Sequence, residues 1–356
     1  MGPTEEQVYK ALSKIIDPDL GRDIVSLGMI KDLRIEDGVV HFTFELTTPA
    51  CPVRDKFERF AREAVSSIPG VRDVKIDLKS NVRSASMRQT QIQLPGVKNV
   101  IAVASGKGGV GKSTVATNIA GALASFGASV GLLDADIYGP SVPQMMGSSE
   151  QPGVENNKII PPVAHNVKIM SMGYLTKPGQ AVVWRGPMVA KALQQMLSEV
   201  DWGELDYLIV DLPPGTGDAP LTLAQSIPLT AVAVVCTPQD VAVNIAVKSV
   251  QMFRVLKVPI AGLIENMSYY ICPNCGHEAH IFAHGGAEKV AKELKVPFLG
   301  AVPLEEDIRI MSDVGVPIVF SKPESRAAQA FVGIAKALAA QISIRAFRSI
   351  PVVQQV

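Results

Sequence analysis

The residues most clearly suited to chemistry lie at positions 105–114, in the glycine- and lysine-rich sequence SGKGGVGKST. Residues 106–113 fit the pattern G-x-x-x-x-G-K-[ST], in which backbone N–H groups surround the phosphates of a nucleotide. The glycines allow the backbone conformations that point successive N–H groups inward. We therefore expect an ATP site in which Lys112 contacts the β- and γ-phosphates and the Ser113 hydroxyl binds Mg²⁺.

A second lysine, Lys107, distinguishes this loop from an ordinary phosphate loop, which needs no ammonium at that position. Charge develops on the transferred group during phosphoryl transfer, and a second cation would stabilise it. We therefore assign catalytic roles to both lysines, although a solvated surface lysine is the alternative for Lys107. The other loop residues expected to bind the nucleotide are Gly106, Gly108, Gly109, Val110, Gly111 and Thr114.

Carboxylates follow two apolar segments that resemble buried strands. LLDADI supplies Asp134 and Asp136, and LIVDLPPGTGD supplies Asp211. Ligands of α/β sheets bind at the carboxyl ends of the strands, so both groups should lie near the nucleotide. Asp136 is expected to orient the attacking water, and Asp134 to support the metal or Lys112. Asp211 is expected to hold Mg²⁺ through water, because this ion keeps several waters. A helix cap is the alternative for each carboxylate.

Two cysteines have the spacing of metal ligands: Cys272 and Cys275, in YICPNCGHEAH. Thiolates at this spacing can share one metal or cluster, but two of them cannot complete a zinc or [4Fe–4S] site. Either His277 and His280 complete a zinc site within one chain, or a second subunit supplies two more cysteines on a symmetry axis. A redox-active pair is a third interpretation.

The other two cysteines lie in different surroundings. Cys236 belongs to an apolar segment and is expected to be a buried core thiol. Cys51 precedes a predicted helix, whose N-terminus would lower a thiol pKa, so both a reactive thiolate and a plain buried cysteine are open. Four cysteines in 356 residues are too few for a disulfide scaffold, which favours a reducing, cytoplasmic compartment.

These side chains require a scaffold whose strands end at one site. From residue 97 the chain alternates apolar strand-like segments with helix-like segments, which predicts an α/β P-loop NTPase fold. Its mostly parallel sheet should be covered by helices on both faces. The predicted strands are 98–104, 129–135, 167–172, 205–212, 231–237, 260–266 and 297–302. The predicted helices are 112–126, 186–200, 239–256, 285–294 and about 324–341.

The first eighty residues predict a separate small α/β domain of order αββαβ. Its elements are a helix over 4–16, strands over 29–35 and 39–46 around Asp37-Gly38, a helix over 53–68 and a strand over 71–78. The domains are then 1–80, a flexible linker over 81–96 that lets the two domains move, the ATPase domain over 97–342 and a tail over 343–356.

Composition narrows the classes of partner. Lys and Arg together number 34, as do Asp and Glu, so no global field favours nucleic acid or an anionic membrane. The start, MGPTEEQVYK, lacks the pattern of a secretory signal, and no uninterrupted apolar run approaches the length of about twenty residues that spans a membrane. We expect no nucleic-acid partner and no stable membrane association.

Taken as a set, the motifs resemble the Mrp/ApbC family of iron–sulfur cluster carriers. The loop GKGGVGKST resembles the deviant Walker A loop of the SIMIBI class, which includes MinD and ParA. The other motifs that carry the resemblance are DADIYGPS, WRGPM, DLPPGTGD, TPQ, ENM and CPNCG, within residues 98–340. Residues 1–80, with DPD and TTPACP, resemble the small domain fused to many family members.

The resemblance implies a homodimer that holds a [4Fe–4S] cluster between its subunits, receives it from an upstream scaffold and delivers it to apoproteins, with slow ATP hydrolysis. Cys272 and Cys275 become the cluster ligands, and Lys107 crosses the interface to the partner's nucleotide. Asn266 would recognise adenine through its amide, with a structural turn asparagine as the alternative. The chain departs from the family pattern at Ala283, where the family often has glycine. A β-carbon at this position would be unfavourable if the backbone there has a positive φ.

Two other functions stay open at the level of sequence. A positioning ATPase of the MinD/ParA type would need an amphipathic membrane helix or a basic DNA-binding surface. The end of the chain, ISIRAFRSIP, is short for membrane binding, and neither property explains the cysteine pair. The second alternative is a zinc-binding P-loop scaffold protein.

Overall fold

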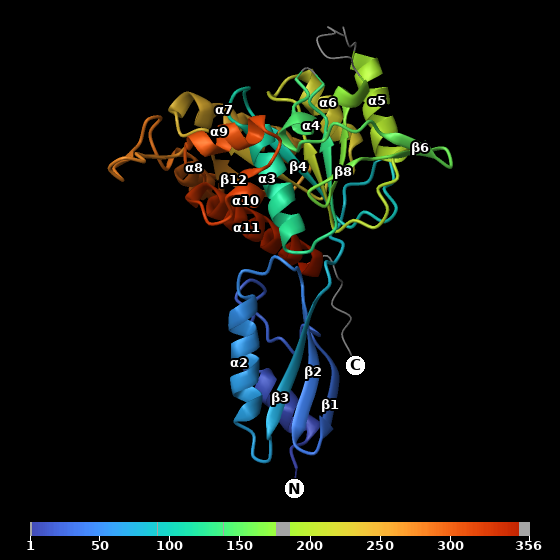
Figure 1. The fold of residues 1–356 in the computed structure, drawn as a ribbon, viewed down its shortest axis with the longest axis vertical. Helices are drawn as coiled ribbons and strands as arrows, with labels where there is room; N and C mark the ends of the chain where they lie inside the picture. The colour runs from blue at the N-terminus through green and yellow to red at the C-terminus, as the bar shows by residue number, and fades with distance from the viewer. Residues whose placement is uncertain (1, 91, 138, 176–185, 349–356) are drawn as a thin grey trace. The chain divides into compact units, whose positions relative to one another are not determined.

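The computed structural model describes residues 2–90, 92–137, 139–175 and 186–348, which form two compact units (Figure 1). One unit comprises Met1–Arg83 with the C-terminal residues from Ala339, and the other comprises Ser84–Leu338. The second unit contains all the nucleotide and cysteine-pair residues predicted from the sequence, so its sheet is the scaffold to be explained first.

An eight-stranded sheet forms the centre of the second unit, in the order β15-β12-β11-β4-β10-β5-β9-β8. All neighbouring strands are parallel except the edge pair β8–β9. The strands are β4 (Val100–Ser105), β5 (Val130–Asp134), β8 (Val163–Ala164), β9 (Val167–Ser171), β10 (Tyr207–Asp211), β11 (Ala231–Cys236), β12 (Ile260–Glu265) and β15 (Phe298–Ala301). Every residue of β4, β5, β10, β11 and β12 is buried, which explains their continuous apolar sequences. The predicted parallel sheet is confirmed.

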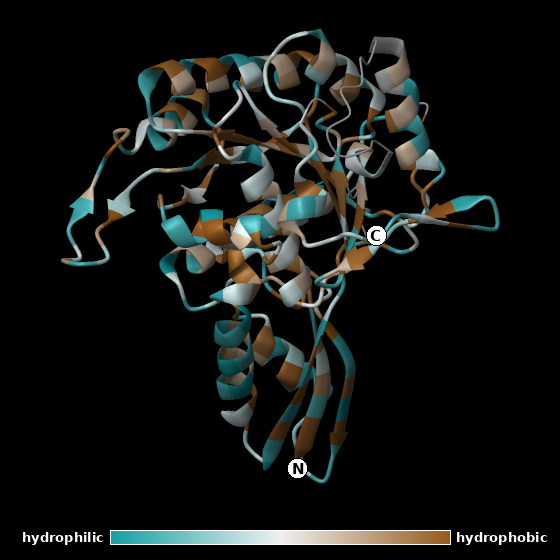
Figure 2. Cartoon of the chain, turned by 45° about the horizontal axis from the view of Figure 1, so that its top comes forward, coloured by the Kyte–Doolittle hydropathy of each residue, from teal (hydrophilic) through white to brown (hydrophobic). Residues whose placement is uncertain are grey.

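Helices enclose this sheet, whose hydrophobic strands lie in the interior (Figure 2). They are α3 (Lys112–Ser125), α4 (Val142–Met145), α5 (Gly186–Ser198), α6 (Asp218–Ser226), α7 (Asp240–Val255), α8 (Gly286–Leu294), α9 (Glu306–Asp313), α10 (Ile318–Ser321) and α11 (Arg326–Arg348), with a 3-10 turn at Met172–Leu175. Two hairpins join β6 (Gly153–Glu155) to β7 (Lys158–Ile160), and β13 (Tyr270–Ile271) to β14 (Glu278–Ala279). The sequence did not predict α6, α9 or the hairpins, because these elements are short or exposed. The motif WRGPM begins at residue 184, outside the described residues, as does Tyr138 of DADIYGPS.

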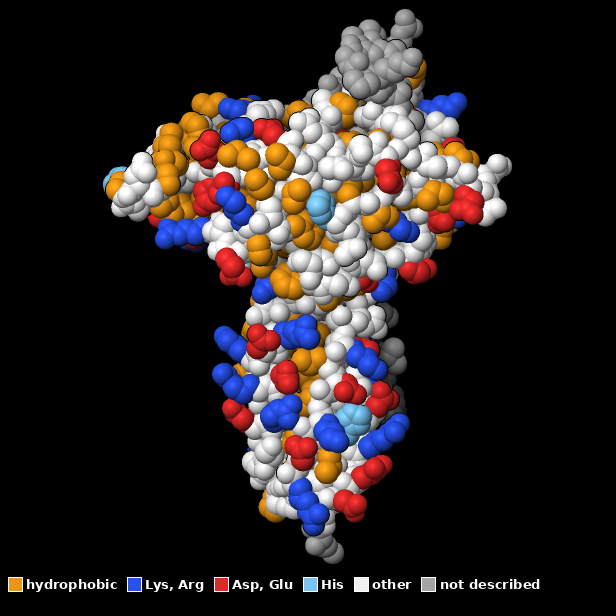
Figure 3. Space-filling model, in the orientation of Figure 1, with side chains coloured by type: hydrophobic (Ala, Val, Ile, Leu, Met, Phe, Trp, Pro, Cys, Tyr) orange, Lys and Arg blue, Asp and Glu red, His pale blue; other side chains and the backbone are white. Residues whose placement is uncertain are grey.

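Positive and negative side chains are interspersed on the face of the molecule drawn in Figure 3. This agrees with the equal totals of 34 basic and 34 acidic residues in the sequence.

The segment that follows the small domain has no helix or strand over residues 81–90 and 92–96, yet part of it belongs to the second unit. The backbone N–H of Arg88 donates to the Leu229 carbonyl at 3.1 Å, and its guanidinium donates to the Ala224 carbonyl at 3.1 Å. Ala85 is buried. These contacts give this part of the predicted flexible linker a defined path along the ATPase domain.

The first unit is a three-stranded sheet with two helices, in the predicted order αββαβ. Its elements are α1 (Glu5–Leu12), β1 (Ile30–Glu36), β2 (Val39–Leu46), α2 (Arg54–Ser66) and β3 (Asp73–Ser80). β2 lies in the middle, antiparallel to β1 and parallel to β3, and its Phe42 and Phe44 are fully buried. α1 ends four residues before the predicted position 16: Ser13 is its C-cap, and Ile16 forms an isolated β-bridge with Asp23.

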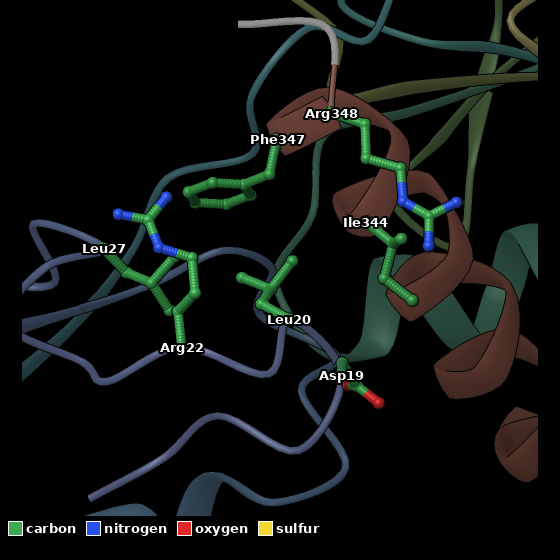
Figure 4. Close-up of a pocket in the computed structure, with 7 residues that line it drawn as sticks. All are labelled: Asp19, Leu20, Arg22, Leu27, Ile344, Phe347 and Arg348. Carbon is green, nitrogen blue, oxygen red and sulfur yellow. The ribbon is translucent and has the colours of Figure 1, made fainter. Parts of the chain in front are cut away.

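α11 is longer than the periodicity predicted: the helix expected to end near residue 341 continues to Arg348. Its last turns belong to the first unit, where Phe347 packs against the hydrophobic core and the Arg83 guanidinium lies 4.5 Å from the ring centroid. A pocket of about 150 Å³ at this end of the helix has Leu20, Leu27, Ile344 and Phe347 as its apolar lining (Figure 4). The predicted tail is therefore helical up to Arg348, and residues 349–356 lie outside the described residues.

Within the described part of the chain, α11 is also the one helix that is long and apolar enough to cross a membrane. Half of its apolar window is buried inside the protein, and Phe331 and Leu338 are fully buried. Burial of this kind is typical of a core helix.

The close approach of β12 to β15 can be tested at Gly262, whose φ is +157°. A Cβ at this position would lie 2.6 Å from Leu299 Cγ and 2.8 Å from the Pro297 carbonyl oxygen. Gly262→Ala should therefore lower the free energy of unfolding by about 1–3 kcal/mol, measured by urea denaturation.

The matched control is Gly333→Ala on α11, where nothing lies within 4 Å of the added Cβ. This substitution should raise the free energy of unfolding by about 0.5–1 kcal/mol, because alanine loses less conformational entropy in a helix. Equal denaturation midpoints for the two variants would contradict the described packing of β12 on β15.

Candidate functional site

The predicted phosphate loop connects β4 to α3, the strand–loop–helix setting that its sequence requires. Gly109 and Gly111 have φ values of +78° and +79°, in the region that favours glycine. A Cβ on Gly106 would contact Ile245, and a Cβ on Gly111 would overlap the side-chain amide of Asn266. The loop follows a path that requires glycine and ends at a helix N-terminus, which fits a bound phosphate.

Lys112 lies at the centre of a group of charged side chains beside this loop. Its Nζ is 2.6 Å from Asp211 Oδ1 and 3.5 Å from Asp136 Oδ2. The Ser113 hydroxyl donates to Asp211 Oδ2 at 2.5 Å. The structure thus brings together four residues that were predicted from three separate motifs.

Asp211 is completely buried, and burial raises the pKa of its carboxyl group above the ordinary value. The Lys112 ammonium and the Ser113 hydroxyl oppose this rise in pKa, because both stabilise the carboxylate. Ser113 and Asp211 offer the oxygen ligands that Mg²⁺ prefers beside nucleotide phosphates, so this pair fits the predicted ion. When bound, the ion would neutralise phosphate charge.

Asp134, predicted to support the metal or Lys112, is held by hydrogen bonds from the loop that follows β5. Its carboxylate accepts hydrogen bonds of 2.9–3.2 Å from the backbone N–H groups of Asp136, Ser141 and Val142 and from the Ser171 hydroxyl. These bonds order the loop after β5 and so place Asp136 beside Lys112. Burial, together with the charge of Asp211, raises the pKa of Asp134 to about 7.

Lys107 is exposed, in contrast to Lys112, which is 6% exposed. Its carbonyl accepts a hydrogen bond from the Ser105 hydroxyl at 3.0 Å, which fixes the backbone. No residue that the structure describes forms an ion pair with its ammonium.

Asn266 makes a contact of the kind expected for a structural asparagine, which was the alternative to adenine recognition. Its Nδ2 donates to the Val110 carbonyl at 2.8 Å, so it ties the end of β12 to the phosphate loop. The side chain is almost fully buried. Recognition of adenine by the same amide stays a prediction.

Cys272 and Cys275 lie at the tip of the β13–β14 hairpin, which projects from its unit at the left of Figures 1 and 2. The turn is closed by hydrogen bonds from the Gly276 N–H to the Cys272 carbonyl at 2.8 Å and from the Cys272 N–H to the His277 carbonyl at 2.9 Å. Cys275 is exposed and Cys272 partly buried. Within the described ranges, no group of three or more His, Cys, Asp and Glu side chains is placed to hold a metal ion.

The cysteines differ in acidity. Backbone N–H groups of Asn274 and Cys275, and the Cys275 thiol, lower the pKa of Cys272. Burial in β11 raises the pKa of Cys236 to about 12, in agreement with the predicted core thiol. Cys51 packs against the core of the small domain. Cys272 is therefore the thiol with the clearest bias toward the thiolate that binds metal.

Ala283 has a φ of +74°, so its backbone is in the left-handed conformation. Glycine, which the family often has at this position, adopts that conformation more easily than alanine. This conformation costs a residue with a Cβ about 1–2 kcal/mol. The strain lies near the base of the cysteine hairpin, just before α8.

Two buried polar residues of the site, Ser171 and Glu265, were assigned no role from the sequence, although Glu265 belongs to the motif ENM. Ser171 ends β9 and binds Asp134, and Glu265 ends β12 and accepts from the N–H groups of Gly285 and Ala287. An acidic residue at the end of an apolar strand is the signal that could have found Glu265. The serine carries no such signal.

Comparison with known proteins adds an independent finding. The NUBPL iron-transfer P-loop NTPase family matches residues 96–339, and an iron-sulfur cluster assembly protein family matches residues 5–78. The chain is 48% identical over 348 residues to the iron-sulfur cluster carrier protein of Deinococcus radiodurans, covering 97% of this chain and 98% of that one.

Solved structures agree on the fold of the larger unit. A nucleotide-binding protein in complex with ADP from Archaeoglobus fulgidus is 38% identical, with a TM-score of 0.56 over 62% of this chain and 87% of that one. The cell division ATPase MinD of Pyrococcus furiosus is 24% identical, with a TM-score of 0.52 over 67% and 97% of the two chains. At this identity the likeness to MinD shows the fold alone.

The acidity of the thiols can be tested by alkylation. Cys272 should react with iodoacetamide at a lower pH than an ordinary thiol, because its pKa is lowered, whereas Cys236 should stay unmodified in the folded protein. Peptide mass spectrometry after short exposures between about pH 6 and pH 9 would give both rates. Equal modification of Cys236 and Cys272 would contradict the described burial.

Proposed function

The chain belongs to the family of NUBPL iron-transfer P-loop NTPases, and on this premise we propose that it is an ATP-dependent iron–sulfur cluster carrier. In this proposal two copies hold one [4Fe–4S] cluster between them and transfer it to apoproteins. The observation that carries the proposal is the exposed cysteine pair at the tip of a hairpin, which offers half of the thiolates that a cluster needs.

The shortage of ligands favours a shared site. A [4Fe–4S] cluster takes four cysteine thiolates, and one hairpin supplies Cys272 and Cys275. A two-fold axis through the site brings the same pair from a second copy and completes the set. The lowered pKa of Cys272 favours capture of iron, and the exposed position of Cys275 gives a recipient protein access.

ATP is the second substrate in this proposal. Lys112 contacts its terminal phosphates, Ser113 and Asp211 hold Mg²⁺, and Asp136 orients the attacking water. Asp136 suits this role because it is 13% exposed beside Lys112, so water can reach it. Lys107 acts across the dimer interface on the partner's nucleotide and stabilises the charge of phosphoryl transfer.

The same proposal includes the cellular location and the partners of the protein. It works in the cytoplasm, receives clusters from an upstream scaffold and delivers them to client apoproteins, without nucleic acid or stable membrane association. The relative from Deinococcus radiodurans carries the name iron-sulfur cluster carrier protein, which supports this assignment. No observation favours a positioning ATPase, because the likeness to MinD extends to the fold alone.

Cys272→Ala should abolish loading of the cluster while leaving ATP binding intact, because the cysteine hairpin and the phosphate loop use different residues. Lys112→Ala should have the opposite effect and weaken ATP binding at least about tenfold, since it removes a charge-assisted contact. Anaerobic reconstitution, with iron and sulfide analysis and the absorption spectrum, measures loading, and equilibrium dialysis measures ATP. A Cys272→Ala protein that loads a full cluster would contradict the ligand assignment.

Lys107→Ala should retain ATP binding but lower the rate of hydrolysis by about a thousandfold, the scale of a cation supplied in trans to a transferred phosphoryl group. The measurement is phosphate release together with the mass of the ATP-bound protein by light scattering. Lys98→Ala is the control, because this lysine pairs with Asp206, away from the loop. Hydrolysis that is unchanged in Lys107→Ala would remove the proposed role across the interface.

A further inference from the structure

One carboxylate closes the base of the segment that carries the cysteine hairpin. Glu265 ends β12 and is fully buried. Its Oε1 accepts from the Ser268 hydroxyl at 2.6 Å and from the Gly285 N–H at 2.8 Å, and its Oε2 accepts from the Ala287 N–H at 2.7 Å. Ser268 precedes the hairpin, and Gly285 and Ala287 follow it. Glu265 therefore holds both ends of the segment.

The same network fixes the last residues before α8. Ser268 has a single hydroxyl proton, which it donates to Glu265, so its oxygen accepts from His284 Nδ1 at 2.7 Å. His284 lies between the strained Ala283 and Gly285, the N-cap of α8. A carboxylate at this helix N-terminus is also favoured by the helix dipole. The network therefore offsets the strain of the left-handed residue.

The next residue along the chain reaches the nucleotide site. Asn266 donates its side-chain N–H to the Val110 carbonyl at 2.8 Å, and its backbone N–H to the Cys236 carbonyl on the sheet at 2.8 Å. Val110 lies between Gly109 and Gly111, which both have positive φ, so its carbonyl direction depends on the conformation of the phosphate loop. A Cβ on Gly111 would overlap the Asn266 amide, so the contact needs glycine there.

We propose that Glu265 is a positioning residue that, through its neighbour Asn266, couples nucleotide binding to the position of the cysteine hairpin. Phosphates that bind the loop reorient its peptides, and the Val110 carbonyl moves with them. Asn266 follows that carbonyl, and Glu265 then changes its hold on the two ends of the hairpin segment. The biological purpose of this coupling rests on the proposed function. The coupling itself is argued from contacts within one chain.

The readout is the alkylation rate of Cys272, measured on the metal-free full-length protein with and without Mg-ATP. All variants carry Lys107→Ala, so that the response arises within one chain and not from a shared interface. With Glu265 present, Mg-ATP should change the Cys272 rate by at least about fivefold, the lower end of measured couplings between sites. In Glu265→Gln the ratio of the two rates should fall close to one, while the Kd of Mg-ATP stays within about twofold.

Two further variants separate coupling from structural damage. Ser268→Ala leaves the bonds from Glu265 to α8 in place but frees the start of the segment, so it should also reduce the ratio. Glu278→Gln, an exposed carboxylate on β14 that pairs with His280, should keep the ratio of the parent. A purely structural role would change the basal Cys272 rate and leave the ratio unaltered.

The inference would be overturned if Mg-ATP left the alkylation rate of Cys272 unchanged in the parent protein. It would also be overturned if Mg-ATP changed this rate as much in both Glu265→Gln and Ser268→Ala as in the parent. Cluster loading is measured separately on the protein with its natural Lys107. Failure to load with an intact nucleotide response would remove the proposed function and leave the coupling in place. Cluster loading without a nucleotide response would remove the coupling and leave the proposed function in place.

Discussion

The ion pair between Lys112 and Asp211 is the interaction on which the nucleotide site depends. β10 lies between β4 and β5, and Asp211 is the register partner of Asp134, so two buried carboxyl groups end at one edge of the sheet. A buried carboxylate left without a partner costs about 3–5 kcal/mol. Lys112 reaches Asp211 from the first turn of α3, and Asp134 receives four hydrogen bonds, so both groups are compensated in different ways.

Exposure divides the candidate residues into two sets with different tasks. Lys112, Asp211 and Asn266 are buried and have their contacts within the chain. Lys107 and Cys275 are exposed, and both are proposed to meet a second copy. A carrier must also release its cargo. The proposed cluster ligands, on a projecting hairpin, would meet that need, whereas a thiol as deeply buried as Cys236 would not.

The end of β12 lies between these two sets of residues. Glu265 and Asn266 are consecutive, yet one contacts the base of the cysteine hairpin and the other contacts the phosphate loop. Parallel strands bring their carboxyl ends to the same edge, which is why a residue pair late in the chain reaches a loop more than a hundred residues earlier. The strained Ala283 lies on the hairpin side of this junction.

The sequence by itself determined the features that depend on local chemistry. The phosphate loop follows from its glycines and its position between strand and helix, and the central strands agree with prediction within two residues because fully buried strands are continuous apolar runs. The cysteine spacing placed both thiols on one turn. The order of the small domain followed from its periodicities and from the Asp37-Gly38 turn.

The tertiary structure alone decided which distant polar groups meet. Asp136 and Asp211, and not Asp134, pair with Lys112, because strand register and the loop after β5 place them there. Glu265 finds its partners beyond the hairpin, and α11 extends because Phe347 packs against residues from the start of the chain. A local pattern records which residues are buried, but partners far apart in sequence become neighbours only when the whole sheet is assembled.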